Sequence, residues 1–206
     1  MKKILTTIVI IGGLGFSALP QQNEFPDVNL PLSVAKGIPS GWILTGSNPR
    51  DYEVTQDNIE TYSGYFSSSL KSVANRPQGY VTLMQTFNSD KYKGERISFS
   101  GYVKSKLVSE WAALWMRVDD VLGRPLCFDN MSNRPIVGSS DWVKYEIVLE
   151  VPTNSSEISV GVLLDGKGQI WFDKFELKIV GQDIPVTDQL KNKFEKLEPN
   201  NLDFEH

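Results

Sequence analysis

Residues 111–119 alternate in character with a period of two, and this pattern constrains the fold more than any other feature of the chain. One set of positions is apolar and holds Ala112, Leu114, Met116 and Val118. The other set holds Trp111, Ala113, Trp115 and Arg117. Because side chains alternate across a β-strand, the two sets lie on opposite faces. We therefore predict a strand whose apolar face packs into a core.

The face with Trp111, Trp115 and Arg117 has two interpretations. A strand with a core on one side normally carries polar residues on the other, so two tryptophans there would expose a large apolar surface unless something covers them. Either a loop or a second layer of the protein covers this face, or a ligand binds to it. The sequence leaves both open.

Short β-type runs separated by turn residues follow one another from Trp42 onward. The expected strands are 80–87, 96–104, 110–118, 125–129, 142–151, 157–164 and 169–180. Asp165-Gly166-Lys167-Gly168 is a typical hairpin loop between two of them. No sustained helical period occurs before Thr187. We predict one all-β domain at 38–182, a β-sandwich of two antiparallel sheets, after a Pro- and polar-rich lead-in at 21–37.

The first twenty residues have the layout of a secretory signal peptide. Lys2 and Lys3 precede an uncharged apolar run from Ile4 to Phe16, and the small-residue step at 15–17 leads into polar residues. The run is shorter than the ~20 apolar residues that span a bilayer. We expect residues 1–20 to direct export to an extracytoplasmic location, secreted or at the cell surface, and then to be removed. An uncleaved N-terminal anchor is the alternative, and only that form would contact a membrane.

Residues 183–206 form a C-terminal tail of different character. Leu190, Phe194 and Leu197 are spaced by four and three residues, and Thr187 or Asp188 can serve as an N-cap. This spacing favours one short helix over 186–197. The last residues, which include Leu202 and Phe204, are either disordered or lie against the sandwich as an edge strand.

Charge, cysteine and histidine counts exclude several classes of function. A formal net charge of −4 gives no electrostatic footprint for nucleic acid. Cys127 is the single cysteine and cannot form an internal disulfide, so we expect a small buried hydrophobic residue. His206 is the single histidine, which excludes His-based catalytic triads and multi-histidine metal sites.

Several segments beyond 111–119, most of them aromatic or glycine-containing, are informative when taken as a set. They include Trp42, Tyr62-Ser63-Gly64, Met84-Gln85-Thr86, Phe99-Ser100-Gly101-Tyr102, Phe128-Asp129-Asn130-Met131, Arg134-Pro135-Ile136, Asp141-Trp142 and Gln169-Ile170-Trp171-Phe172-Asp173. As a set, over residues 38–182, they resemble bacterial galactose-binding-domain-like jelly rolls, which are similar to the jelly-roll carbohydrate-binding modules of polysaccharide-degrading enzymes. The resemblance implies a jelly-roll β-sandwich and a glycan or other small polar ligand. Similar domains also look like sensory or accessory parts of transcription regulators.

Sugars present apolar C–H faces and a ring of hydroxyls, so their sites pair flat aromatics with amides, carboxylates and arginine. We expect Trp111 and Trp115 to form a stacking platform, with polar contacts from Arg117, Gln85, Asp129 and Asn130. Each polar residue has an alternative: a buried Gln85 bonded to backbone, an Asn130 that caps a turn, and an Arg117 that pairs with Asp129 or stacks on Trp115. Trp42, Trp142 and Trp171 are expected to anchor the core or the sheet ends.

No cofactor is required by this chemistry, but the resemblance implies a structural calcium ion. In such modules an Asp on the last strand is one ligand, and Asp173 matches that position. Ca²⁺ takes six to eight oxygen ligands, and the sequence does not supply a full set. The alternative is that Asp173 accepts hydrogen bonds from a neighbouring loop.

These observations lead to one main hypothesis and two alternatives. The main hypothesis is an exported, non-catalytic module that binds a carbohydrate on an aromatic sheet face. The first alternative is a protein-interaction or sensory module whose Trp face docks another chain. The second is a small glycoside-active enzyme that uses a pair of carboxylates among Asp119, Asp120, Asp129 and Asp173. The sequence leaves the oligomeric state open.

Overall fold

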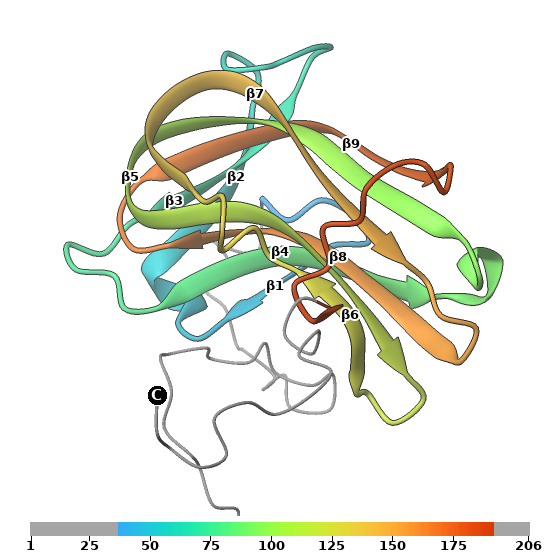
Figure 1. The fold of residues 1–206 in the computed structure, drawn as a ribbon. Coiled ribbons are helices and arrows are strands. Elements are labelled where there is room, and N and C mark those ends of the chain that lie inside the picture. The colour runs from blue at the N-terminus through green and yellow to red at the C-terminus, as the bar shows by residue number, and fades with distance from the viewer. Residues whose placement is uncertain (1–36, 192–206) are drawn as a thin grey trace, which may run out of the picture.

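The computed structural model describes residues 37–191, and its regular elements are β-strands apart from two 3₁₀ turns (Figure 1). The strands are β1 (Ile43–Gly46), β2 (Tyr52–Asp57), β3 (Ser67–Ser72), β4 (Tyr80–Asn88), β5 (Arg96–Asp120), β6 (Pro125–Asp129), β7 (Ile136–Glu150), β8 (Ser155–Asp165) and β9 (Gln169–Val180). The turns are η2 (Pro49–Asp51) and η3 (Asp90–Tyr92). Within residues 37–191, no helix has the length and hydropathy needed to cross a membrane. The expected signal segment at 1–20 lies outside the described residues.

All strand pairs are antiparallel, and the order is β1-β4-β8-β5-β9-β3-β2, with β6 and β7 also paired to β5. The strands curl into two layers that share β5 (Figure 1). Its residues 96–106 pair with β9, and its residues 111–120 pair with β8. We call the layer of β2, β3, β9, β7 and the first half of β5 the first sheet. The second sheet contains β1, β4, β8, β6 and the second half of β5. The predicted jelly-roll sandwich is confirmed.

The 25-residue strand β5 corrects the prediction of two separate strands at 96–104 and 110–118. The chain remains extended between them, but Leu107 adopts a positive φ of 54° and the register with β7 shifts there. Core residues accordingly switch from odd positions, such as Ile97 and Val103, to even ones, such as Leu114. A local irregularity of this kind changes which face of a strand points inward. It lets one strand pass from one sheet to the other.

The core lies between the two sheets and is built from branched aliphatic side chains of both. Leu83, Leu114 and Val162 of the second sheet are cross-strand neighbours and are at most 1% exposed. Ile97 and Ile147 of the first sheet are fully buried. Burying one such side chain contributes about 1.5–3 kcal/mol.

Cys127 on β6 is buried and free, as expected from its isolation in the sequence. Burial raises the pKa of its thiol to about 12, and the nearby Asp188 carboxylate acts in the same direction. The thiol is therefore in its neutral, unreactive form at physiological pH.

The segment after β9 binds to the sandwich through backbone hydrogen bonds rather than as a helix. The Thr187 N–H donates to the Val148 carbonyl and the Gln189 N–H to the Phe128 carbonyl, both at 2.8 Å. The Thr187 hydroxyl accepts the Val148 N–H at 3.0 Å, so it does not cap a helix. Residues 186–190 do not form the start of the helix expected at 186–197, because they bond to β6 and β7 instead. Residues 192–197 lie outside the described range.

Candidate functional site

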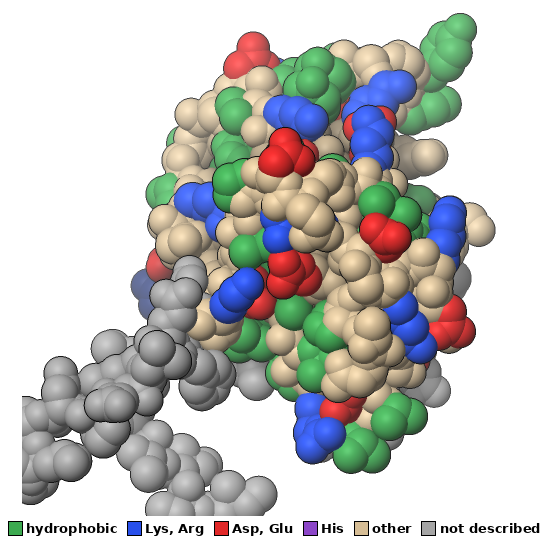
Figure 2. Space-filling model, turned by 45° about the vertical axis from the view of Figure 1, so that its right-hand side comes forward, with side chains coloured by type: hydrophobic (Ala, Val, Ile, Leu, Met, Phe, Trp, Pro, Cys, Tyr) green, Lys and Arg blue, Asp and Glu red, His purple; other side chains and the backbone are tan. Residues whose placement is uncertain are grey.

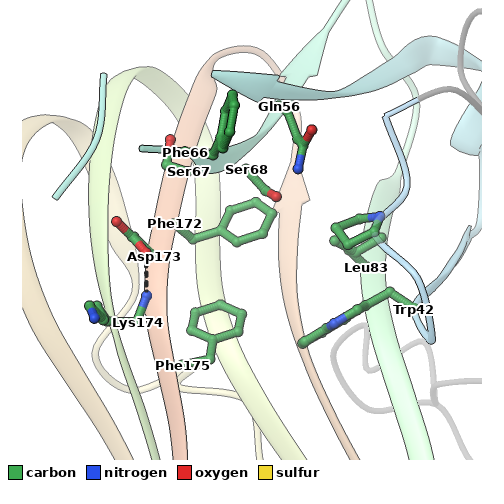
Figure 3. A pocket seen from close by; sticks show the side chains of 11 residues that line it. Trp42, Gln56, Phe66, Ser67, Ser68, Leu83, Phe172, Asp173, Lys174 and Phe175 are labelled. Atoms are coloured by element: carbon green, nitrogen blue, oxygen red, sulfur yellow. Dashed lines mark hydrogen bonds between the residues drawn. The ribbon is translucent and has the colours of Figure 1, made fainter. Parts of the chain in front are cut away.

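The Trp face, defined as Trp111, Ala113, Trp115 and Arg117, lies on the outer surface of the second sheet. On β8 its cross-strand neighbours include Asp165 and Gly161, whereas Leu114 and Met116 are opposite Val162 and Val160. Leu83, which shares the inner face with Leu114, lines a cavity of about 240 Å³ together with Phe172 of the first sheet (Figure 3). The predicted assignment of Trp111 and Trp115 to one face, opposite Leu114 and Met116, is confirmed.

That cavity opens at the end of the sandwich, between the two sheets. Trp42 packs against Phe175 across it, with ring centroids 5.7 Å apart, and Figure 3 shows both rings directed into the gap. Trp42 thus anchors a sheet end, as expected.

Trp115 is buried, with 1% of its surface exposed. Its indole N–H donates to the Thr82 hydroxyl at 2.7 Å, and Thr82 in turn donates to the Val162 carbonyl at 3.0 Å. The indole crosses β8 over Gly161, where a Cβ atom would lie only 2.6 Å from the indole nitrogen. The expectation that Trp115 offers an open stacking surface is therefore wrong, and the interpretation of a covered tryptophan holds.

Arg117 is also buried, with 7% of its surface exposed. Its Nε donates to Asp119 Oδ2 at 2.8 Å, so its partner is Asp119 rather than Asp129. Burial raises the pKa of the Asp119 carboxyl, and the Arg117 charge opposes that rise. Because breaking a buried ion pair leaves an uncompensated charge, the pair fixes this end of the Trp face. Because Arg117 is buried and paired with Asp119, the expectation that it is accessible to a ligand is wrong.

The remaining expected polar contacts are not brought to the Trp face. Gln85 is opposite Val160, on the inner side of the second sheet, and lines the space between the sheets. Asp129 is fully buried and pairs with Arg134 at 2.6 Å. Asn130 accepts the Ser132 N–H at 3.2 Å, as a turn-capping residue does. Asp129 and Asn130 thus stabilise the fold locally, whereas Gln85 is partly exposed in the space between the sheets.

One end of the Trp face is partly exposed and carries a row of three side chains, Tyr80, Asp165 and Trp111, which we call the aromatic–carboxylate row. Tyr80 on β4 is opposite Asp165 on β8, which is opposite Trp111 on β5. The Trp111 indole N–H donates to Asp165 Oδ2 at 3.3 Å. Adjacent strands are about 4.8 Å apart, so the two aromatic residues flank the carboxylate across about 10 Å.

Sequence reasoning found Trp111 but missed Tyr80 and Asp165. Tyr80 begins a predicted strand and Asp165 begins a predicted hairpin loop, so each had an ordinary local explanation. Only the register of β4, β8 and β5 brings them together. Burial raises the pKa of the Tyr80 hydroxyl, and the Asp165 charge adds to that effect while Arg117 opposes it.

Asp173 holds a loop, and its environment does not fit a calcium ion. Its Oδ2 accepts the N–H groups of Tyr62 and Ser63 at 3.2 and 3.0 Å, and its Oδ1 accepts the Lys174 N–H at 2.7 Å. Across residues 37–191, no three His, Cys, Asp or Glu side chains are grouped so as to hold a metal ion. The donors directed at Asp173 match the loop-binding alternative.

Two proteins of Bacillus subtilis strain 168 resemble the chain in sequence. The HTH-type transcriptional regulator YbfP is 45% identical over 167 residues, which are 80% of this chain and 56% of YbfP. The tRNA nuclease WapA is 26% identical over 148 residues, which are 68% of this chain and 6% of WapA. The chain therefore spans only part of the relatives that it matches. No family model matches it.

Solved structures with a similar fold include binding modules and part of a phage protein. A xylan-binding domain of carbohydrate-binding module family 22 matches with a TM-score of 0.50 and 19% identity, over 77% of this chain and 100% of that one. A family 16 carbohydrate-binding module matches with a TM-score of 0.50 and 12% identity, over 72% and 98% of the two chains. The enzymatically active domain of tailspike protein 4 from bacteriophage CBA120 matches with a TM-score of 0.53 and 17% identity, over 68% of this chain and 20% of that one. The fold is thus that of jelly-roll carbohydrate-binding modules.

Proposed function

We propose that this protein is a non-catalytic carbohydrate-binding module and that the aromatic–carboxylate row is its ligand site. The observation that carries the proposal is the alignment of Tyr80, Asp165 and Trp111 on three adjacent strands of an outer sheet face. All three side chains are partly exposed, and Trp111 also packs against the hydrophobic core. The jelly-roll fold shared with carbohydrate-binding modules supports the same ligand class.

The chemistry of the row suits a sugar. The apolar face of a pyranose ring stacks on an aromatic ring, and its hydroxyl groups donate to a carboxylate. Asp165 is held by the Trp111 N–H through one oxygen, so its second oxygen is oriented for a ligand hydroxyl. Further along the same face of β5, Trp115 and Arg117 are packed and paired, which fixes the strands that position the row. Their role is structural support.

Other ligand classes have less support. Figure 2 shows Lys and Arg side chains interspersed with Asp and Glu over the face in view, without a basic stripe of the kind that binds nucleic acid. A catalytic role would need a free pair of carboxylates, but Asp119, Asp129 and Asp173 each accept hydrogen bonds from structural partners. We therefore favour binding without catalysis.

The test is a calorimetric titration with soluble xylan, xylohexaose, cellohexaose and galactotriose. Substituting Trp111→Ala should weaken binding by about 1–3 kcal/mol, the usual contribution of one aromatic stacking surface. Trp111→Phe should retain part of the affinity because the ring remains while the N–H to Asp165 is lost. Lys178→Ala, an exposed change on the first sheet, is the control and should bind as wild type. Unchanged affinity of Trp111→Ala for a bound sugar would rule out the row as the site.

A sensory role is the second candidate, favoured by the 45% identity to the regulator YbfP. In that case sugar binding would alter the activity of a DNA-binding part. A chimera in which this chain replaces the matching segment of YbfP tests the idea. DNA binding by the chimera should respond to a sugar that binds the isolated module, and a response lost with Trp111→Ala would link the two. If the sugar does not change DNA binding by the chimera, the sensory role is ruled out and binding is the module's only role.

Export from the cytoplasm, with the first twenty residues as the signal, remains part of the proposal. It is checked by N-terminal sequencing of protein recovered from the culture medium or cell surface.

A further inference from the structure

We infer that the first sheet carries a second saccharide site, on the side of the sandwich opposite the aromatic–carboxylate row. It has two adjoining parts. The Tyr62 platform consists of Tyr62, Tyr102 and Trp142. The Lys104 cleft beside it has a volume of about 510 Å³. Neither part contributes to the core between the sheets.

The platform presents an exposed aromatic ring that is held in place. Tyr62 stacks on Tyr102 with centroids 3.6 Å apart and an interplanar angle of 13°, and Trp142 meets Tyr62 edge-on at 5.9 Å. Tyr62 is nevertheless 41% exposed, although it contacts both of these rings. An exposed, flat aromatic ring is what the C–H face of a sugar stacks on.

Two carboxylates fix the loop that carries Tyr62. Asp173 accepts the backbone N–H groups of Tyr62 and Ser63, as described above. Asp57 accepts the N–H groups of Ile59 and Glu60 at 2.8 and 3.0 Å and also the Trp171 indole N–H at 2.8 Å. A platform ordered before the ligand arrives loses little conformational entropy on binding.

The cleft adjoins the platform because its residues are close neighbours of the platform residues in sequence. Glu60 precedes Tyr62 by two positions, Lys104 follows Tyr102 by two, and Asp141 precedes Trp142. Its lining residues include Glu60, Lys104, Lys106, Ser105, Ser140 and Asp141. Its volume falls within the range of small-molecule sites, about 300–1,000 Å³.

The polar groups of the cleft indicate a neutral, hydroxyl-rich ligand. Lys104 Nζ lies 2.8 Å from Glu60 and 3.7 Å from Asp141, and Lys106 adds a second ammonium. Two cations thus face two carboxylates, so the cleft has no net charge to select an ion. The Ser105 and Ser140 hydroxyls, 3.0 Å apart, each donate and accept. Donors and acceptors beside an aromatic surface match a neutral saccharide unit.

Since the two sites lie on opposite outer faces, one short oligosaccharide cannot occupy both. The module would therefore bind two chains and link them. A link of this kind raises the apparent affinity for an insoluble polysaccharide above that of either site.

The experiment follows the indole N–H signals of uniformly ¹⁵N-labelled protein during titration with xylohexaose, cellohexaose and galactotriose. Trp142 and Trp171 report on the first sheet, whereas Trp111 and Trp115 report on the second. We expect at least one sugar to shift the Trp142 or Trp171 signals with its own saturation curve. No such shift with any of the three sugars at 10 mM would overturn the second site, whatever the Trp111 signal does.

Variants sharpen the result. Tyr62→Ala should weaken the Trp142 response about tenfold, as expected for the loss of one stacking surface, while the Trp111 response stays unchanged. Tyr65→Ala is the matched control, since Tyr65 belongs to the same loop and is 87% exposed. Lys104→Met, which keeps the side-chain stem but removes the ammonium, should weaken the response severalfold. A Tyr62→Ala protein whose Trp142 response equals that of Tyr65→Ala would also overturn the inference.

Discussion

Trp115 on the second sheet and Tyr62 over the first sheet are both aromatic side chains on outer faces, yet 1% of Trp115 and 41% of Tyr62 is exposed. Trp115 lies over Gly161, and its N–H is bonded to Thr82. Tyr62 stacks on Tyr102 and remains partly open to solvent. Both rings are ordered, but only Tyr62 can receive a ligand. An aromatic residue outside the core is therefore evidence of binding only when one of its faces is free.

The same contrast holds for the charged residues near each ring. Arg117 and Asp119 are buried together, with side-chain exposures of 9% and 2%. Lys104 and Glu60 pair at a similar distance, but their side chains are 27% and 40% exposed. A buried pair mainly constrains the fold, whereas a partly solvated pair can exchange its partners for ligand hydroxyls.

The largest expected effect is on folding stability at Trp115. Replacing this buried ring, Trp115→Ala, should lower the free energy of unfolding by about 3–5 kcal/mol, and Leu114→Ala by about 2–5 kcal/mol, because each leaves a cavity. Urea denaturation followed by circular dichroism measures both. A loss below about 1 kcal/mol for Trp115→Ala would show that the ring is not packed as described.

A smaller effect is expected at Gly161, which makes room for that indole. A Cβ atom there would lie 2.6 Å from Trp115 Nε1 and 2.8 Å from the Leu83 carbonyl oxygen. Gly161→Ala should therefore cost about 1–3 kcal/mol through overpacking. The double change Gly161→Ala with Trp115→Ala should cost less than the sum of the two. Additive losses in the same denaturation assay would separate Gly161 from Trp115.

The smallest effect concerns pH and the loop that carries Tyr62. Hydrogen bonds from the Glu60 and Ile59 N–H groups, with a further one from Trp171, hold the pKa of Asp57 below its ordinary value of 3.8. The stabilisation is thus complete above that value and is lost as pH falls through the lowered pKa. The Trp171 indole signal should shift in this acidic range in wild type but not in Asp57→Asn. An equal shift in both proteins would assign the change to another group.

Local sequence patterns were sufficient for much of the fold. The bounds of β6 and β9 agree with the prediction, since alternation and flanking turn residues mark both strands. The strands β1 to β3 were not predicted individually; β3, for example, reads Ser-Ser-Ser-Leu-Lys-Ser and has little β-type signal of its own. It is a strand because it pairs with β9 and β2. The continuity of β5 through Leu107 was likewise missed, because the mostly polar residues 104–110 interrupt the hydrophobic pattern.

The candidate site was only partly within reach of the sequence. Of its members, Trp111 was identified because it shares a strand with Trp115 and Arg117. Asp165 and Tyr80 are 54 and 31 residues away in the chain and join it only through strand register. Asp57 and Asp173 hold the loop that carries Tyr62 beside Lys104. The Tyr62–Asp173 and Trp171–Asp57 hydrogen bonds each join residues more than a hundred positions apart.

The sequence by itself determined the all-β class and the two-faced strand at 111–119, because alternation and apolar character are local properties. The tertiary structure alone decided which aromatic residues are covered. Whether a side chain on an outer face meets solvent depends on what the neighbouring strands place beside it, such as Gly161 under Trp115 or Tyr102 beneath Tyr62. Burial is a property of the whole packing arrangement, so no short stretch of sequence specifies it.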